Sequence, residues 1–161
     1  MYKAGVRALV RHGIRRLNGG DPSFLLRLCG PDPQLAFPGD NSWAAMFRPV
    51  EKGRECHVTH RGYDECKAFA DRFVANRIQF AIEDILVNGP PWHLRIALRV
   101  HDYIDGPPGG PDVYNNRAVA IIELRWFKLV RWEDYEDCER VAAWDAATAP
   151  LPSARRARTP S

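Results

Sequence analysis

The 161-residue sequence has few cysteines, no long apolar run and no concentration of basic charge in its body. No stretch approaches the roughly 18 apolar residues of a membrane-spanning helix, so we expect no membrane partner. Arg7 and Arg11 interrupt the N-terminal apolar positions, which argues against a signal peptide. The cysteines show no Cys-x-x-Cys spacing, which argues against a disulfide framework; they are Cys29, Cys56, Cys66 and Cys138. We therefore expect a cytoplasmic protein with reduced thiols.

Basic charge is concentrated near the C-terminus. The formal net charge is +3, but Arg155, Arg156 and Arg158 all lie in the final segment "APLPSARRARTPS". That segment has no apolar periodicity, so we predict a single domain over residues 1–147 followed by a disordered basic tail over 148–161. The body is then close to neutral. Nucleic-acid binding usually needs basic residues clustered on one face of a fold, so the sequence argues against it.

The sequence "CHVTH" brings Cys56, His57 and His60 together. These side chains could begin a metal site, but structural zinc needs four ligands and no second pair follows at a suitable spacing. We therefore predict no metal ion, and we interpret the segment as a loop or the edge of a strand.

Hydrophobic periodicity places helices early in the chain and strands later. Helical spacing predicts helices over residues 3–18, over a short segment from residue 22, and over 62–76. "PQLAFPG" is a short apolar strand, and residues 40–55 have no clear period. Alternating and β-branched runs then predict four antiparallel strands, over residues 78–87, 93–104, 114–126 and 128–137. This order indicates an α+β domain in which helices pack on one face of a curved sheet. The sequence leaves open whether residues 39–61 form a lid.

Two short motifs carry a family resemblance, "GYDECKAFADRF" from residue 62 and "KLVRWEDYED" from residue 128. With the order of elements, they resemble the SnoaL-like proteins of the nuclear transport factor-like superfamily over residues 3–147. The resemblance implies a cone-shaped α+β barrel, in which a curved, mixed and mainly antiparallel sheet wraps around N-terminal helices and encloses a pocket. It also implies a homodimer. Members include ketosteroid isomerases, polyketide cyclases, limonene epoxide hydrolases, scytalone dehydratases and non-enzymatic binding modules, so the resemblance alone does not fix the function.

The segment "WEDYED" resembles the last strand of limonene epoxide hydrolases, which carries a Trp-x-Asp-Tyr-x-Asp pattern. The resemblance implies that Asp134 is a general acid or base. Arg99 matches that family's arginine, and His101 stands where the family has a second aspartate. We expect Asp134, Arg99 and His101 to project into one enclosed space, where such a set could exchange protons near neutrality. The same side chains could instead form a polar network with no chemistry.

The short strand departs from both relatives. Its apolar "QLAFPG" stands where limonene epoxide hydrolases hold a water with a Tyr and an Asn. Phe37 occupies the position of the ketosteroid isomerase base, which argues against isomerisation by that base. We predict that the substrate contacts are Phe37, Arg95, Tyr114 and Trp132.

Two functions follow. The first is a cofactor-free isomerase, cyclase or epoxide hydrolase-like enzyme acting on a small hydrophobic polyketide, terpene or steroid-like molecule. The second is a non-catalytic ligand-binding or dimerisation module in which the same residues only brace the cone.

Overall fold

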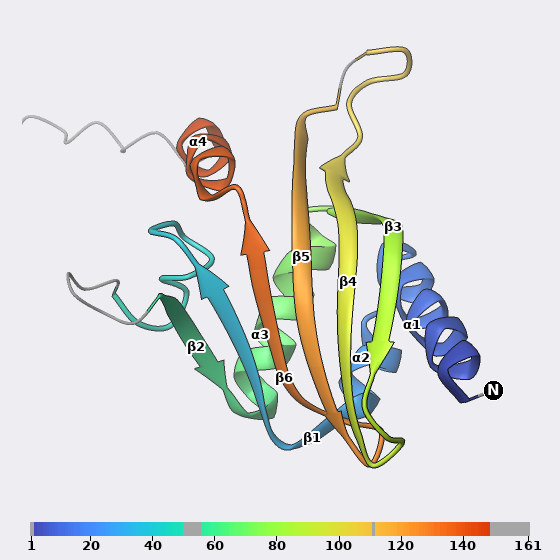
Figure 1. The fold of residues 1–161 in the computed structure, drawn as a ribbon. Helices are drawn as coiled ribbons and strands as arrows, with labels where there is room; N and C mark the ends of the chain where they lie inside the picture. Colours follow the sequence, from blue (N-terminus) through green and yellow to red (C-terminus); the bar gives the residue numbers. More distant parts are fainter. Residues whose placement is uncertain (1, 50–55, 111, 149–161) are drawn as a thin grey trace, which may run out of the picture.

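A computed structural model describes residues 2–49, 56–110 and 112–148. Within them, six strands form one sheet, and helices cover one of its faces (Figure 1). The helices are α1 (Tyr2–Asn18), α2 (Ser23–Leu28), α3 (Gly62–Ala75) and α4 (Cys138–Thr148). The strands are β1 (Cys29–Pro38), β2 (His57–Arg61), β3 (Gln79–Asn88), β4 (His93–Ile104), β5 (Tyr114–Arg125) and β6 (Lys128–Glu136). The predicted α+β class is confirmed.

The sheet has the order β2-β1-β6-β5-β4-β3. Strands β3 to β6 form the predicted antiparallel meander, and β1 pairs with β6 in parallel, so the sheet is mixed and mainly antiparallel as expected. Because β2 and β3 lie at its two edges, the sheet stays open and does not close into a barrel.

Strand alternation separates an apolar inner face from a charged outer face. On β4, Leu94, Ile96, Leu98 and Val100 are at most 2% exposed, and the residues between them face outward. Each such side chain stabilises the fold by about 1.5–3 kcal/mol. The apolar stripes of α1 and α3 pack against this face through Val6, Ile14 and Cys66. Leu17 of α1 and Phe73 of α3 form a second apolar cluster with Trp43, Ile78 and Val141.

One strand was predicted only as an alternative to a loop, and one helix was not predicted. Strand β2 arises from the "CHVTH" segment, where His57 and Val58 pair with the end of β1. Helix α4 has only Val141 fully buried and so carries no apolar stripe from which to predict it. Part of the segment considered as a lid, residues 50–55, lies outside the described residues, as does the predicted tail from residue 149.

Among the described residues, no helix is both long enough and apolar enough to cross a membrane. No group of three or more His, Cys, Asp or Glu side chains in the same ranges is placed to hold a metal ion.

Candidate functional site

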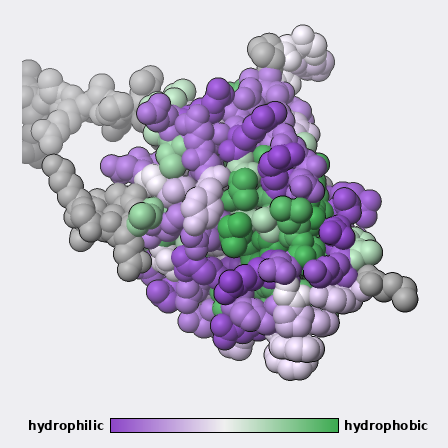
Figure 2. Space-filling view, viewed as in Figure 1, coloured by the Kyte–Doolittle hydropathy of each residue, from purple (hydrophilic) through white to green (hydrophobic). Residues whose placement is uncertain are grey.

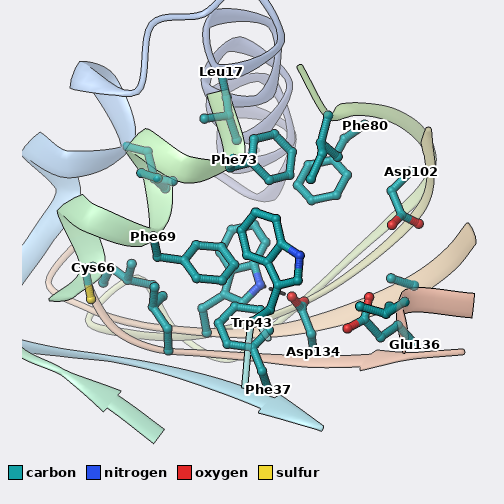
Figure 3. Close-up of a pocket in the computed structure, with 18 of the residues that line it drawn as sticks. Leu17, Phe37, Trp43, Cys66, Phe69, Phe73, Phe80, Asp102, Asp134 and Glu136 are labelled. Atoms are coloured by element: carbon teal, nitrogen blue, oxygen red, sulfur yellow. Dashed lines mark hydrogen bonds between the residues drawn. The ribbon is translucent and has the colours of Figure 1, made fainter. Parts of the chain in front are cut away.

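A cavity lies between the inner face of the sheet and the helices. Its walls come from helices α1 to α4, from the loop after β1 and from strands β1, β3, β4, β5 and β6. The cavity volume open to the centres of water-sized molecules is about 90 Å³. One water molecule needs roughly 10–15 Å³ of such volume. Aromatic side chains supply much of the lining (Figure 3): Phe37, Trp43, Phe69, Phe73, Phe80, Tyr114, Trp132 and Trp144.

Three carboxyl groups gather at one end of this cavity, those of Asp102, Asp134 and Glu136 (Figure 3). Asp102 lies on β4, whereas Asp134 and Glu136 lie on β6, with β5 between them. On β5, Ala120 pairs with Asp134, and Ala118 pairs with Glu136. The methyl groups of these alanines leave room for the longer acids of β6, whereas Asp102 pairs with Asn116 of β5.

Asp102 is 5% exposed. The hydroxyl of Tyr114 donates to Asp102 Oδ2 at 3.3 Å, and Asn116 Nδ2 donates to the Tyr114 oxygen at 3.1 Å. The other oxygen, Asp102 Oδ1, has no hydrogen-bond partner among the described residues. Burial raises the pKa of Asp102, because desolvation penalises the charged carboxylate.

Asp134 and Glu136 have pKa values close to neutrality. Burial raises the pKa of Asp134 to about 7, although Trp132 Nε1 donates to its Oδ1 at 2.7 Å and favours the charged form. Burial, together with the negative charges of Asp134 and Asp102, raises the pKa of Glu136 to about 8. The described lining residues include no Lys, Arg or His that would lower these values. At neutral pH one carboxyl of this pair can therefore hold a proton while the other is ionised.

The wall formed by α4 and the loop after β1 is held by polar contacts. Asp145 accepts hydrogen bonds from the amide and the hydroxyl of Ser42, both at 2.7 Å. The guanidinium of Arg72 lies 3.9 Å from the ring centroid of Trp43 and donates to Ser42 O. These contacts fix Trp43 and Trp144 as part of the lining.

The expectation that Arg99 and His101 share a space with Asp134 is wrong. The Arg99 side chain is 59% exposed on the outer face, where its Nε lies 3.0 Å from Glu83 Oε2. His101 stacks on Tyr103 and borders a polar depression on the same outer face. The physical reason is strand alternation, because β4 pairs with β5 without a bulge from His93 to Ile104.

Three of the four predicted substrate contacts lie in the cavity, and the fourth lies on the outer face. Phe37, Tyr114 and Trp132 line the cavity. Arg95 is exposed on the outer face, and its placement at the substrate is wrong for the same reason as that of Arg99.

Two of the acids in the cavity were not predicted as site residues. The alternation of Leu94, Ile96, Leu98 and Val100 continues directly to Asp102, and that of Trp132 and Asp134 continues to Glu136. This signal was present in the sequence and would have placed both acids inside. Trp43 and Trp144 come from segments without clear periodicity, so only the tertiary structure places them.

No protein-family model matches the sequence, and no curated protein matches it significantly. Several solved structures do match the chain over most of its length. An NTF2-like protein from Mesorhizobium loti superposes with a TM-score of 0.56 at 16% identity, over 81% of this chain and 89% of that one. A protein from Jannaschia sp. CCS1 that is considered a SnoaL-like polyketide cyclase gives 0.56 at 16% identity, over 89% and 92%.

A third similar structure is SalBIII, an epoxide hydrolase/cyclase-like enzyme with a role in pyran ring formation in the polyether salinomycin. It superposes with a TM-score of 0.58 at 12% identity, over 86% of this chain and 95% of that one. The superpositions cover most of both chains in all three cases, at identities that establish the fold alone. The chain therefore has the NTF2-like fold that SnoaL-like cyclases share, and the resemblance inferred from its motifs is confirmed at the level of fold.

Proposed function

We propose that this protein binds a small, largely apolar molecule in the cavity and transfers protons to and from it, with Asp134 and Glu136 as the general base and the general acid. The observation that carries the proposal is the meeting of ionisable carboxyl groups with an otherwise apolar and aromatic cavity. A general acid or base works best when its pKa lies near the working pH. The values of about 7 for Asp134 and about 8 for Glu136 meet that condition.

The two raised pKa values allow one carboxyl group to act as the base and the other as the acid. Near pH 7 one carboxyl group of the pair holds a proton while the other is ionised, and we assign the ionised form to Asp134. Asp134 would remove a proton from an acidic carbon or from an attacking hydroxyl group. Glu136 would donate its proton to the oxygen that becomes negative. In an isomerisation Asp134 would then return its proton to a different carbon and Glu136 would take its own proton back from the enol oxygen. In a cyclisation or an epoxide opening the product would keep the proton from Glu136, and the proton taken up by Asp134 would pass to Glu136 to restore the pair. These reactions need no cofactor, and the similarity to an epoxide hydrolase/cyclase-like enzyme supports this class.

The test uses two small probes with a proton-transfer readout. We would measure deuterium incorporation at the α-carbon of 2-indanone by NMR, and the opening of styrene oxide by chromatography. Acid–base groups contribute about 10²- to 10⁴-fold to such reactions, so Asp134→Asn should lower the rate on at least one probe by about 10²-fold. Asp71→Asn is the matched control, because Asp71 is an exposed acid on α3 that pairs with Lys67.

Equal rates for wild type and Asp134→Asn on both probes would overturn the catalytic proposal. If the cavity binds the probes without turning them over, the non-catalytic ligand-binding module is the better description.

We also propose that the outer face of the sheet pairs with a second copy of the chain. An apolar patch interrupts this charged face over the middle of β3, β4 and β5 (Figure 2). Cross-strand pairing places its residues side by side, and Leu86 and Ile121 are 60% and 38% exposed. The patch consists of Leu86, Ala97, Val119 and Ile121. An exposed patch with a charged rim is typical of a protein interface.

Light scattering tests this pairing. Wild type should have twice the mass of one chain, and Ile121→Arg should halve that mass because it buries a charge in the interface. Val113→Arg, in the loop between β4 and β5, is the control because Val113 is also exposed but lies away from the patch. A monomeric wild type at micromolar concentration would contradict the proposal.

A further inference from the structure

The carboxyl end of the cavity carries negative charge that no lining side chain neutralises. Asp102, Asp134 and Glu136 are the charged residues among the described lining residues, and none of the others is basic. His101 is the basic side chain that lowers the pKa of Asp102, but its imidazole lies on the outer face of the sheet and not in the cavity. Compensation from inside the cavity must therefore come from a bound molecule or from protons.

One atom in the same place lacks a hydrogen bond. Asp102 is 5% exposed and lines the cavity, and its Oδ1 has no partner among the described residues. In Figure 3 its carboxyl group points toward the space between it and Asp134. An unpaired buried carboxylate oxygen costs about 1–3 kcal/mol or more, so a ligand that donates a hydrogen bond to it gains a strong contact.

Aromatic rings surround this end of the cavity. The rings of Tyr114 and Trp144 have centroids 5.4 Å apart, and the Tyr114 hydroxyl is bonded to Asp102. The indole of Trp132 is bonded to Asp134. Carboxylates together with aromatic faces stabilise an organic cation through ion pairing and cation–π attraction. A metal ion fits less well, because these carboxyl groups are not placed as metal ligands.

We propose that the molecule bound in this cavity is an amine, whose protonated nitrogen donates a hydrogen bond to Asp102 Oδ1 and whose apolar remainder lies among the aromatic side chains. The inference rests on the proposed function, since it names the substrate class of the same cavity. Asp102 then binds the ligand, while Asp134 and Glu136 stay available for proton transfer.

The test compares three molecules of similar size and different charge, 2-phenylethylamine, 2-phenylethanol and phenylacetate, by isothermal titration calorimetry at pH 8. A charge-assisted hydrogen bond is about twice as strong as a neutral one, so the amine should bind at least about tenfold more tightly than the alcohol, and phenylacetate more weakly than either. Asp102→Asn should remove the preference for the amine and leave the affinity for the alcohol within about twofold, because the charge is lost and the shape is kept. Asp71→Asn is again the control.

A second measurement uses wild type alone, in case Asp102→Asn does not fold. The affinity for the amine should fall at least about tenfold between pH 8 and pH 6, because Asp134 and Glu136, with pKa values of about 7 and about 8, take up protons and the negative charge beside the ammonium group is lost. The affinity for the alcohol should stay constant. Equal affinities for the amine and the alcohol at pH 8 would overturn the amine inference and leave the proposed binding function standing. Absence of binding by all three molecules at about 5 mM, a concentration at which even weak fragment binding is measurable, would overturn both.

Discussion

The raised pKa of Asp134 predicts how the stability of the protein depends on pH. Its pKa rises from 3.8 in the unfolded chain to about 7 in the folded protein. Between these values the folded state holds a proton that the unfolded state releases, so the free energy of unfolding falls as pH rises. A pKa difference of about 3 lowers the free energy of unfolding by an amount on the order of 4 kcal/mol, and this loss of stability is complete only above pH 7. Below pH 3.8 this loss is absent.

Asp134→Asn removes this titration and keeps an oxygen that can accept the hydrogen bond from Trp132 Nε1. We therefore expect the variant to gain stability relative to wild type by about 3 kcal/mol between pH 5 and pH 8. Urea unfolding at both pH values measures this difference, and the comparison cancels the titration of groups that do not interact with Asp134. The pKa of Glu136, which the charge of Asp134 raises, should fall in the variant and add to the gain. Asp71→Asn should follow wild type at both pH values. A stability difference between Asp134→Asn and wild type that is the same at pH 5 and pH 8 would refute the reasoning.

Three further predictions concern the scaffold. Trp126 and Phe127 form the turn between β5 and β6, with φ of 49° and 61°. Phe127→Gly should stabilise the protein by up to about 1 kcal/mol in thermal unfolding, because glycine adopts this left-handed backbone conformation without strain. A loss of stability would contradict this. Asp145→Ala removes two hydrogen bonds to Ser42 and should cost about 2 kcal/mol in urea unfolding, whereas an unchanged midpoint would mean that α4 is held by other contacts. Ala118→Leu puts a larger side chain into a buried position that lines the cavity and is 6% exposed. It should destabilise by about 1–3 kcal/mol and abolish ligand binding measured by calorimetry, and retained affinity would place the ligand elsewhere.

Periodicity predicted the meander because each of its strands buries one face. The predicted ranges for β4 and for the helix at residue 62 agree with the structure to within one residue. Helix α4 could not be predicted, since it packs mainly through Val141 and is held by the polar contacts of Asp145. Those contacts join residues about a hundred positions apart, and no local pattern records them.

The site was predicted in part. The family motif indicated Asp134, and the structure places Asp134 in the cavity. The same motif led to Arg99, although the apolar residues of β4 already assigned the inner face to the positions that continue to Asp102. When a motif and strand alternation disagree about which face a side chain occupies, the burial of several apolar residues outweighs one matched position.

The raised pKa values of Asp134 and Glu136 depend on the strand that lies beside them, and not on the acidic motif itself. A carboxyl group keeps a raised pKa while apolar side chains surround it, and it exchanges protons with a ligand only if there is room for the ligand beside it. Ala118 and Ala120 provide both for Glu136 and Asp134, which lie beside them in the register of β5 with β6. Their side chains are apolar and extend no further than a methyl group. A register shifted by one residue would turn these acids toward the outer face, beside Arg117 and Val119. The pairing of two strands therefore makes "WEDYED" a candidate site, and the acidic residues alone would not.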